Sequence, residues 1–148
     1  MIDYTGKLNE HEKYIEMLNV LDKDCDYIEV VIVDGSKNNH IVNRFNKDVI
    51  SYRSVSMWWC TVTKKSHYLF KIKYTRKLLE YLKTFETFCK YHEYGSNEET
   101  LRRGDYGETT DFGMDDIAFY DKNGRCLLST TTHEGYVSIN SELVEGYF

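Results

Sequence analysis

The sequence predicts a single α+β domain, in which an antiparallel or mixed sheet of about six strands carries two main helices on one face. Three observations favour this class. Two segments repeat apolar residues at helical spacing, several others alternate apolar and polar residues or are rich in β-branched ones, and Asn123-Gly124 separates two extended segments. The 148 residues contain no proline, internal repeat or linker-like tract, so we expect residues 1–148 to form one domain.

The two helices are predicted at residues 10–21 and 75–92. In the first, Asn9 and Glu12 fit a capping box, and in the second Thr75 is the expected N-cap. The first apolar stripe consists of Tyr14, Ile15, Leu18 and Leu21, and the second of Leu78, Leu79, Leu82, Phe85 and Cys89. Because both stripes follow the helical period, each helix is expected to bury one side against the sheet.

The first half of the sheet is predicted from two patterns. Residues 27–34 form a β-branched run that ends at Asp34-Gly35, which is typical of a buried strand. Residues 50–62 and 68–74 are expected to form a hairpin across the polar turn 63–66. Between them, residues 35–49 are polar and predict a loop, with a short helical turn near residues 43–49.

The C-terminal half is predicted to begin with one long surface loop, residues 93–113, which is rich in glycine and charge. The segments 116–120 and 125–131 should then pair as a hairpin across Asn123-Gly124. A short strand at 136–139 and a helical turn from Ser141 complete the expected element order.

Charge is the least random feature of the chain. Residues 63–90 contain eight basic and two acidic side chains, whereas residues 93–116 contain eight acidic and two basic ones. The formal net charge of −5 repels phosphate backbones at long range. In addition, the aromatic and lysine side chains of residues 68–74 should occupy opposite strand faces, so bases could not stack where the charges are. The sequence therefore disfavours nucleic acid and favours a protein partner with a basic surface.

Most candidate binding residues come from residues 93–116, which we call the acidic segment, and the others are Trp58, His133 and Glu134. The carboxylates of the acidic segment match no known cation-binding loop, so we interpret them as a docking surface. Trp58 and Trp59 are expected on opposite faces of a strand, one in the core and one as a binding anchor. The candidate residues are Trp58, Asp105, Tyr106, Glu108, Asp111, Asp115, Asp116, His133 and Glu134.

No catalytic, cofactor or metal site is expected. The chain contains no P-loop, dinucleotide-binding, nucleophile-elbow or zinc-protease motif. Adjacent residues in a strand point to opposite faces, so His133 and Glu134 are interpreted as a turn and not as an acid–base pair. Cys89 and His92 are three residues apart, but a zinc site needs a second close pair of ligands, so we interpret them as packing residues.

The expected compartment is the cytoplasm. The four cysteines are widely spaced without a Cys-x-x-Cys pair, which is unlike a secreted disulfide framework. The N-terminal residues contain no apolar run of the kind found in signal peptides, and no segment is apolar enough to enter a membrane.

Together these features predict a small acidic cytoplasmic domain that binds a protein partner without catalysing a reaction, through the acidic segment and surface aromatic residues. A homodimer is compatible with the same features. In composition the chain is similar to polymorphic-toxin immunity proteins, which are compact, acidic and free of catalytic motifs. Two alternatives stay open: a small-molecule-binding domain with a tyrosine-lined pocket, and a hydrolase that uses His133 with the acidic segment.

Overall fold

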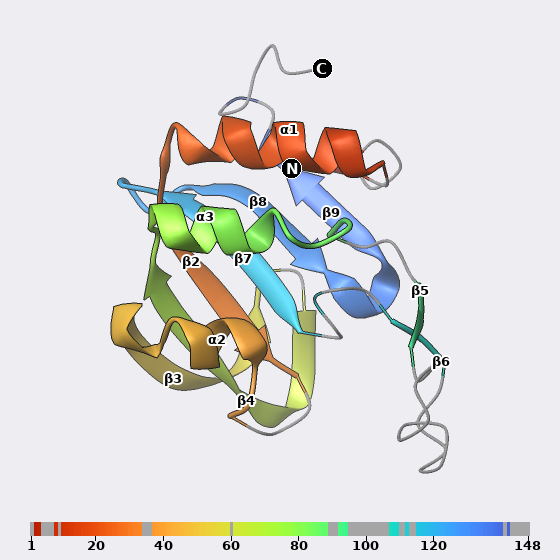
Figure 1. The fold of residues 1–148 in the computed structure, drawn as a ribbon. Coiled ribbons are helices and arrows are strands. Elements are labelled where there is room, and N and C mark those ends of the chain that lie inside the picture. Colours follow the sequence, from red (N-terminus) through yellow and green to blue (C-terminus); the bar gives the residue numbers. More distant parts are fainter. Residues whose placement is uncertain are drawn as a thin grey trace.

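The fold, given by a computed structural model, is a twisted antiparallel sheet with its helices on one face (Figure 1). The structure describes residues 2–3, 8, 10–33, 37–59, 61–88, 92–94, 107–109, 112, 115–140 and 142. Seven strands form the main sheet in the order β1-β9-β8-β7-β2-β4-β3, and every neighbouring pair is antiparallel. The predicted α+β class is therefore confirmed.

The element bounds follow the chain. The main sheet consists of β1 (Ile2–Asp3), β2 (Cys25–Ile32), β3 (Val49–Trp58), β4 (Thr61–Lys73), β7 (Asp116–Asp121), β8 (Cys126–Thr131) and β9 (Tyr136–Ile139). A separate two-stranded sheet pairs β5 (His92–Tyr94) with β6 (Gly107–Thr109). The helices are α1 (His11–Asp22), α2 (His40–Arg44) and α3 (Arg76–Leu82), with 3-10 turns η2 (Asn46–Asp48) and η3 (Thr132–Glu134). None of these helices has the length and apolar character that crossing a membrane requires.

The main core lies between the helices and one face of the sheet. The buried stripe of α1 includes Tyr14 and Leu18, and the Tyr14 hydroxyl donates a hydrogen bond to the carbonyl of Leu82 at the end of α3. In β2, Ile28, Val30 and Ile32 alternate toward this core. The structure places the N-cap of α1 at Glu10, whose side chain makes no capping hydrogen bond, and not at Asn9 as predicted. Asn9 itself lies outside the described residues.

The second predicted helix is shorter than its apolar pattern suggested. Thr75 caps it as expected, because its side-chain oxygen accepts a hydrogen bond from the backbone N–H of Leu78 at 3.2 Å. The helix ends at Leu82, where the hydroxyl of Thr84 donates back to the carbonyl of Tyr81 at 2.6 Å. Such local side-chain bonds compete with the helical ladder. The chain then turns, so Phe85 packs into the core from a non-helical segment.

The β3–β4 hairpin forms as predicted, but its turn lies elsewhere. Met57 pairs with Val62 and Trp58 with Thr61, so the strands reverse between Trp58 and Thr61 and not at 63–66. Residues 63–66 of β4 instead lie opposite the single residue Ser56. The polar cluster that predicted a turn is thus a large bulge, and bulges bend a strand. Pairing continues past it because both tryptophans at the far end are held by hydrogen bonds to the rest of the sheet.

The segment predicted as one loop, residues 93–113, contains structure in its described part. The β5–β6 pair joins both ends of the segment, with Tyr94 opposite Gly107. Phe112 is buried between Phe85 and Phe88, with ring centroids 4.7 Å and 5.3 Å away. The prediction of a wholly surface loop is therefore wrong at Phe112, since an aromatic side chain was overlooked among charged neighbours.

The C-terminal elements agree with the sequence pattern. β7 and β8 pair across a tight turn in which Gly124 has φ +77°, a conformation that favours glycine. The carboxylate of Asp121 accepts hydrogen bonds from the backbone N–H groups of Asn123 and Arg125, each at 2.9 Å, and fixes this turn. The last strand has the predicted bounds, 136–139. Of the predicted C-terminal helical turn, only Glu142 lies within the described residues.

Candidate interaction surface

The face of the sheet that carries no helix is the main candidate surface. Alternation along β2 sends Tyr27, Glu29 and Val31 to this face, and β4 contributes the residues opposite them, Lys73, Lys71 and Leu69. A second, smaller apolar cluster forms here from Val31, Leu69 and Trp58, with Val33, Val55 and Trp59 packed against it. One half of the face is thus covered by the end of the β3–β4 hairpin, and the other half is open.

Two indole N–H groups hold the hairpin end against the sheet. Trp58 Nε1 donates to Oδ2 of Asp116 at 2.7 Å, and Trp59 Nε1 donates to the carbonyl of Thr130 at 2.8 Å. The second oxygen of Asp116 accepts from the backbone N–H of Thr132 at 2.7 Å. Hydrogen bonds to a charged acceptor stabilise by about 1.5–3 kcal/mol. The chain therefore closes over this half of the face through a buried, charge-assisted contact.

The sequence predicted the two tryptophans on opposite faces of a strand, and this prediction is wrong. Both pack on the same apolar cluster, because β3 ends at Trp58 and Trp59 already belongs to the turn. Trp59 has φ +24°, which is unusual for a bulky side chain. Trp58 is buried, so its proposed role as an exposed binding anchor is not compatible with its position. Its indole instead holds the end of the hairpin on the sheet through the hydrogen bond to Asp116.

A histidine with one unsatisfied ring nitrogen lies in the covered half. The ring of His67 packs edge-on against Trp58, with centroids 5.3 Å apart. His67 is 7% exposed, and its Nδ1 atom is buried without a hydrogen-bond partner. A buried polar atom of this kind destabilises the folded state by about 1–3 kcal/mol. The unsatisfied Nδ1 atom of His67 therefore lowers the stability of the packing under the hairpin.

The open half of the face combines tyrosines with opposite charges. The rings of Tyr27 and Tyr120 stack at 5.0 Å, and the Lys71 ammonium lies 4.2 Å from the Tyr27 centroid. The Glu29 carboxylate acts on the Tyr120 hydroxyl through its charge, and it also pairs with Arg53 at 3.7 Å. Burial, followed by the charge of Glu29, raises the pKa of Tyr120. Tyrosines of β2 and β7 thus share this face with a lysine of β4. Within β4 itself, aromatic and lysine side chains lie on opposite faces, as predicted.

The acidic candidates at the start of β7 point into the fold. Asp115 accepts hydrogen bonds from the backbone N–H of Val33 at 2.8 Å and from the side chain of Asn39 at 2.7 Å. Asn39 in turn caps α2. Asp116 is 0% exposed. The expectation that Asp115 and Asp116 present charge outward is therefore wrong, because their carboxylates accept hydrogen bonds from the backbone of Val33 and Thr132 and from the Trp58 indole.

The other candidates are described only in part. Glu134 is exposed on η3, which Gly135 ends at φ +72°, so the turn interpretation of this stretch agrees with the structure. The backbone of Glu108 lies in β6, but its side chain and that of His133 lie outside the described atoms. The candidates outside the described residues are Asp105, Tyr106 and Asp111.

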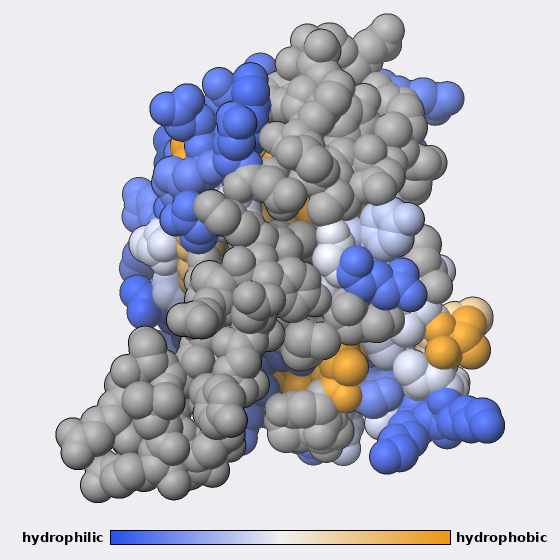
Figure 2. Space-filling model, turned by 90° about the vertical axis from the view of Figure 1, so that its right-hand side faces the viewer, coloured by the Kyte–Doolittle hydropathy of each residue, from blue (hydrophilic) through white to orange (hydrophobic). Residues whose placement is uncertain are grey.

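The hairpin carries the exposed apolar side chains that the sequence reasoning missed. Among described residues the large apolar side chains left exposed are Ile50, Tyr52, Met57, Val62 and Tyr136, and the first four belong to β3 and β4. Met57 is 65% exposed and Val62 76%. On the face drawn in Figure 2, hydrophobic side chains reach the surface at the right-hand edge, beside hydrophilic ones. A signal was present in the sequence, because Ser51, Ser54 and Ser56 make β3 too polar for a buried strand.

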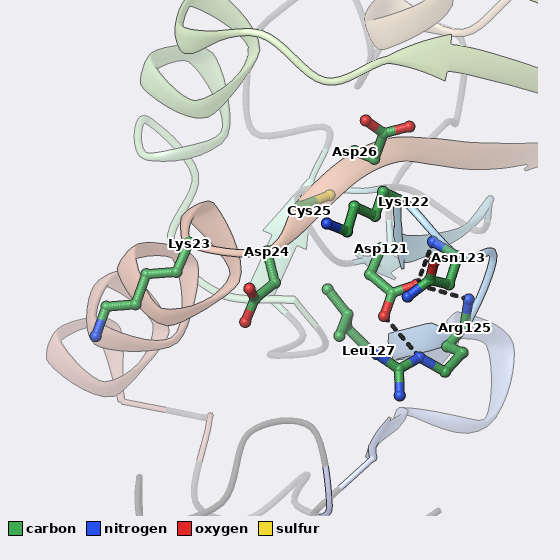
Figure 3. Close-up of a pocket in the computed structure, with 9 residues that line it drawn as sticks. All are labelled: Lys23, Asp24, Cys25, Asp26, Asp121, Lys122, Asn123, Arg125 and Leu127. Carbon is green, nitrogen blue, oxygen red and sulfur yellow. Dashed lines mark hydrogen bonds and ion pairs between the residues drawn. The ribbon is translucent and has the colours of Figure 1, made fainter.

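A small cleft of about 330 Å³ lies between the start of β2 and the β7–β8 turn (Figure 3). The Asp121 carboxylate lines this cleft and also pairs with Arg125 Nε at 2.9 Å. The hydrogen bonds that it accepts, above all the one from the backbone N–H of Arg125, lower its pKa. In Figure 3, Lys23 and Asp26 point away from Asp121. Burial raises the pKa of the neighbouring Cys25 thiol to about 12, which keeps it neutral and poorly nucleophilic. The cleft is lined by groups that already serve the turn.

A wider cleft of about 790 Å³ opens between α2 and α3. The Arg44 guanidinium lies 4.5 Å from the Tyr81 ring centroid, and His40 Nδ1 lies 2.9 Å from the Tyr81 hydroxyl. The ring that could receive a ligand is thus already occupied by a cation. In the part of the chain that the structure describes, no three His, Cys, Asp or Glu side chains come together as metal ligands would.

Comparisons of the chain with protein-family models, with curated proteins and with solved structures found no match.

Proposed function

We propose that this chain is a non-enzymatic protein-binding module of the inhibitory, immunity-like type, and that its contact surface centres on the β3–β4 hairpin. The observation that carries the proposal is the concentration of exposed apolar side chains on the hairpin, at Ile50, Tyr52, Met57 and Val62. Met57 and Val62 pair across the end of the hairpin, and neighbouring exposed apolar side chains are typical of interaction sites. The cysteine pattern supports a cytoplasmic location for the module.

The hairpin side chains alone would not give a specific complex. Burying the exposed part of each of these four side chains contributes about 1 kcal/mol, or about 4 kcal/mol together. Association costs at least about 4 kcal/mol in lost translational and rotational freedom, so this burial alone only offsets that cost. A useful affinity therefore needs further contacts beside the hairpin, from backbone hydrogen bonds or from charge.

The acidic segment is the second part of the proposal. With Asp115 and Asp116 turned inward, the contact to a basic partner surface is assigned to the remaining carboxylates. These are Glu93, Glu98, Glu99, Asp105, Glu108 and Asp111. Opposite charge on a partner would mainly speed association and weaken with salt.

The hydrolase alternative depends on the side chain of His133, which lies outside the described atoms, and it stays a prediction. A small-molecule site lined by tyrosines gains no support from the two clefts, because the arginine over Tyr81 and the turn contacts of Asp121 already occupy their polar groups. Protein binding is the function that the exposed hairpin favours.

The test is affinity capture from the cells that make the protein. The wild-type chain is compared with the double variant Met57→Lys and Val62→Lys, and with Tyr136→Lys, which adds a charge at an exposed apolar side chain on β9, away from the hairpin. We expect one protein to be retained by the wild type and the Tyr136 variant and lost by the hairpin variant. Identical captured proteins for all three chains would contradict the proposal.

A further inference from the structure

The edge of the main sheet at β3 has the features of a site for an added strand. Among the described residues β3 pairs only with β4, so its other edge leaves backbone N–H and C=O groups without a strand partner. Irregular pairing interrupts β3 near both ends, and between the irregular positions Ser51 to Val55 pair without interruption with His67 to Lys71. A regular run of about five residues is a usual strand length, so this part of the edge can accept one.

Strands β3 and β4 carry charged side chains of one sign only. β3 and β4 together contain Arg53, Lys64, Lys65, Lys71 and Lys73 and no carboxylate. Among the described residues two acidic side chains contact them on the helix-free face, and both are buried: Asp116, which accepts from Trp58, and Glu29, which pairs with Arg53 at 3.7 Å. Because the Arg53 side chain is 61% exposed and the pair is long, its guanidinium can bind a second carboxylate while it stays beside Glu29.

The two sides of the edge differ in chemistry. On the helix-free side the exposed run presents Ser51, Arg53 and Val55, with Arg53 at its centre. On the helix side it presents Tyr52, which stacks on Phe70 with ring centroids 5.4 Å apart, has the Lys37 ammonium 5.4 Å from its centroid and is more than half exposed. Because side chains of an added strand alternate between the two sides, an acidic residue beside Arg53 would be flanked by apolar residues beside Tyr52.

We propose that β3 accepts an extended segment of a partner protein, with alternating acidic and apolar residues, as an additional strand of the main sheet. This inference rests on the proposed protein-binding function and names the chemistry of the partner at the hairpin. Backbone hydrogen bonds along Ser51 to Val55 supply affinity, and the Arg53 guanidinium with the apolar surface at Tyr52 supplies sequence preference. The acidic segment of the chain contacts a different, basic part of the partner.

Single-stranded nucleic acid is the competing occupant, because Lys71 lies beside the stacked Tyr27 and Tyr120 rings. The edge favours a peptide for two reasons. The Lys71 ammonium already lies over the Tyr27 ring, where a base would have to stack. The free groups of β3 are backbone donors and acceptors in strand geometry, which a polypeptide matches and a nucleic acid does not.

The experiment is fluorescence anisotropy with labelled probes and the full chain. The first probe is a nonapeptide in which glutamate alternates with valine. The second replaces each glutamate by lysine, the third places proline at the centre, and the fourth is an oligothymidine. We expect the glutamate peptide to bind at least about tenfold more tightly than the other three, since the lysine peptide reverses the charge and proline removes a backbone donor.

Matched arginine variants locate the site. Arg53 and Arg76 have side chains that are 61% and 71% exposed, and each has one carboxylate partner, at 3.7 Å and 3.4 Å. We expect Arg53→Glu to weaken binding of the glutamate peptide about tenfold or more and Arg76→Glu to leave it within about twofold. Equal effects of the two variants, or tighter binding of the lysine peptide or the oligothymidine, would overturn the inference.

The outcome separates the inference from the proposed function. If no peptide binds, but a protein is captured from cells in a manner that depends on Met57 and Val62, strand addition is wrong and the binding function stands. If the glutamate peptide binds through Arg53 and no protein is captured, the inference stands and the proposed cellular function is wrong.

Discussion

The indole of Trp58 donates a hydrogen bond of 2.7 Å to the carboxylate of Asp116, and this contact joins the end of an edge hairpin to a strand of the sheet interior. Asp116 is fully buried and also holds the backbone N–H of Thr132 at 2.7 Å. Since a buried carboxylate requires such donors, the pair fixes where the hairpin end lies. The position of the exposed residues of β3 and β4 follows from it.

Trp58→Phe should lower the free energy of unfolding by about 2–3 kcal/mol, because it removes a donor to a buried charged acceptor. The matched variant is Trp59→Phe, which removes a donor to the backbone carbonyl of Thr130 and should lower it by about 1 kcal/mol. Urea unfolding at neutral pH measures both values. A smaller effect at Trp58 than at Trp59 would show that Asp116 does not depend on the indole.

His67→Phe should raise the free energy of unfolding by about 1 kcal/mol, because the substitution keeps an aromatic ring against Trp58 and removes a buried Nδ1 atom without a partner. His40→Phe is the comparison, since Nδ1 of His40 contacts the Tyr81 hydroxyl at 2.9 Å and no gain is expected there. Thermal and urea unfolding report both variants. A loss of stability at His67 would mean that its ring nitrogen has a role in the fold.

Asp121→Asn should destabilise the protein more at pH 7 than at pH 2.5. The turn hydrogen bonds lower the pKa of Asp121 below the ordinary value of 3.8, so its charged form is favoured in the folded state. That stabilisation is present above the pKa of the unfolded chain and is lost as the pH falls through the folded value. Urea unfolding at both pH values measures the difference, with Asp24→Asn, an exposed residue of the same cleft, as the control. A difference that does not depend on pH would rule out the charge as its cause.

Tyr120→Phe should destabilise the protein at pH 7 by about 0.5–1 kcal/mol, because it removes a partly buried hydroxyl that interacts with the Glu29 carboxylate. The pKa of Tyr120 is raised above its ordinary value of 10.0, so the wild type loses the associated stability as the pH rises above about 10. The gap between wild type and variant should therefore narrow at alkaline pH. Unfolding curves on both sides of pH 10 measure it, and a gap that widens would contradict the Tyr120–Glu29 contact.

Much of the fold could be predicted from the sequence, because local patterns coincide with the tertiary structure. The β-branched run of β2, the Asn123-Gly124 turn and the Thr75 cap each have a local physical cause and occur where expected. The turn of the β3–β4 hairpin could not be placed in this way. Its position depends on Trp58 and Trp59 reaching Asp116 and Thr130, which are far away in the sequence.

The candidate site was harder to predict than the fold. Net charge marked Asp115 and Asp116 as surface groups, although backbone N–H groups and an indole bind them inside the fold. The exposure of Met57 and Val62 depends on which strand forms the sheet edge, and local sequence patterns do not predict strand order. Glu29 was overlooked because its partners, Arg53 and Tyr120, come from two other strands.

The central claim is that the β3 edge receives a strand from a partner, and hydrogen–deuterium exchange of the full chain tests it most directly. With the glutamate–valine peptide at saturating concentration, exchange of the backbone amides of residues 51–55 should slow by about tenfold or more, while α1 and α3 keep their rates. Unchanged exchange at residues 51–55 together with slowing on the helices or at either cleft would contradict the claim.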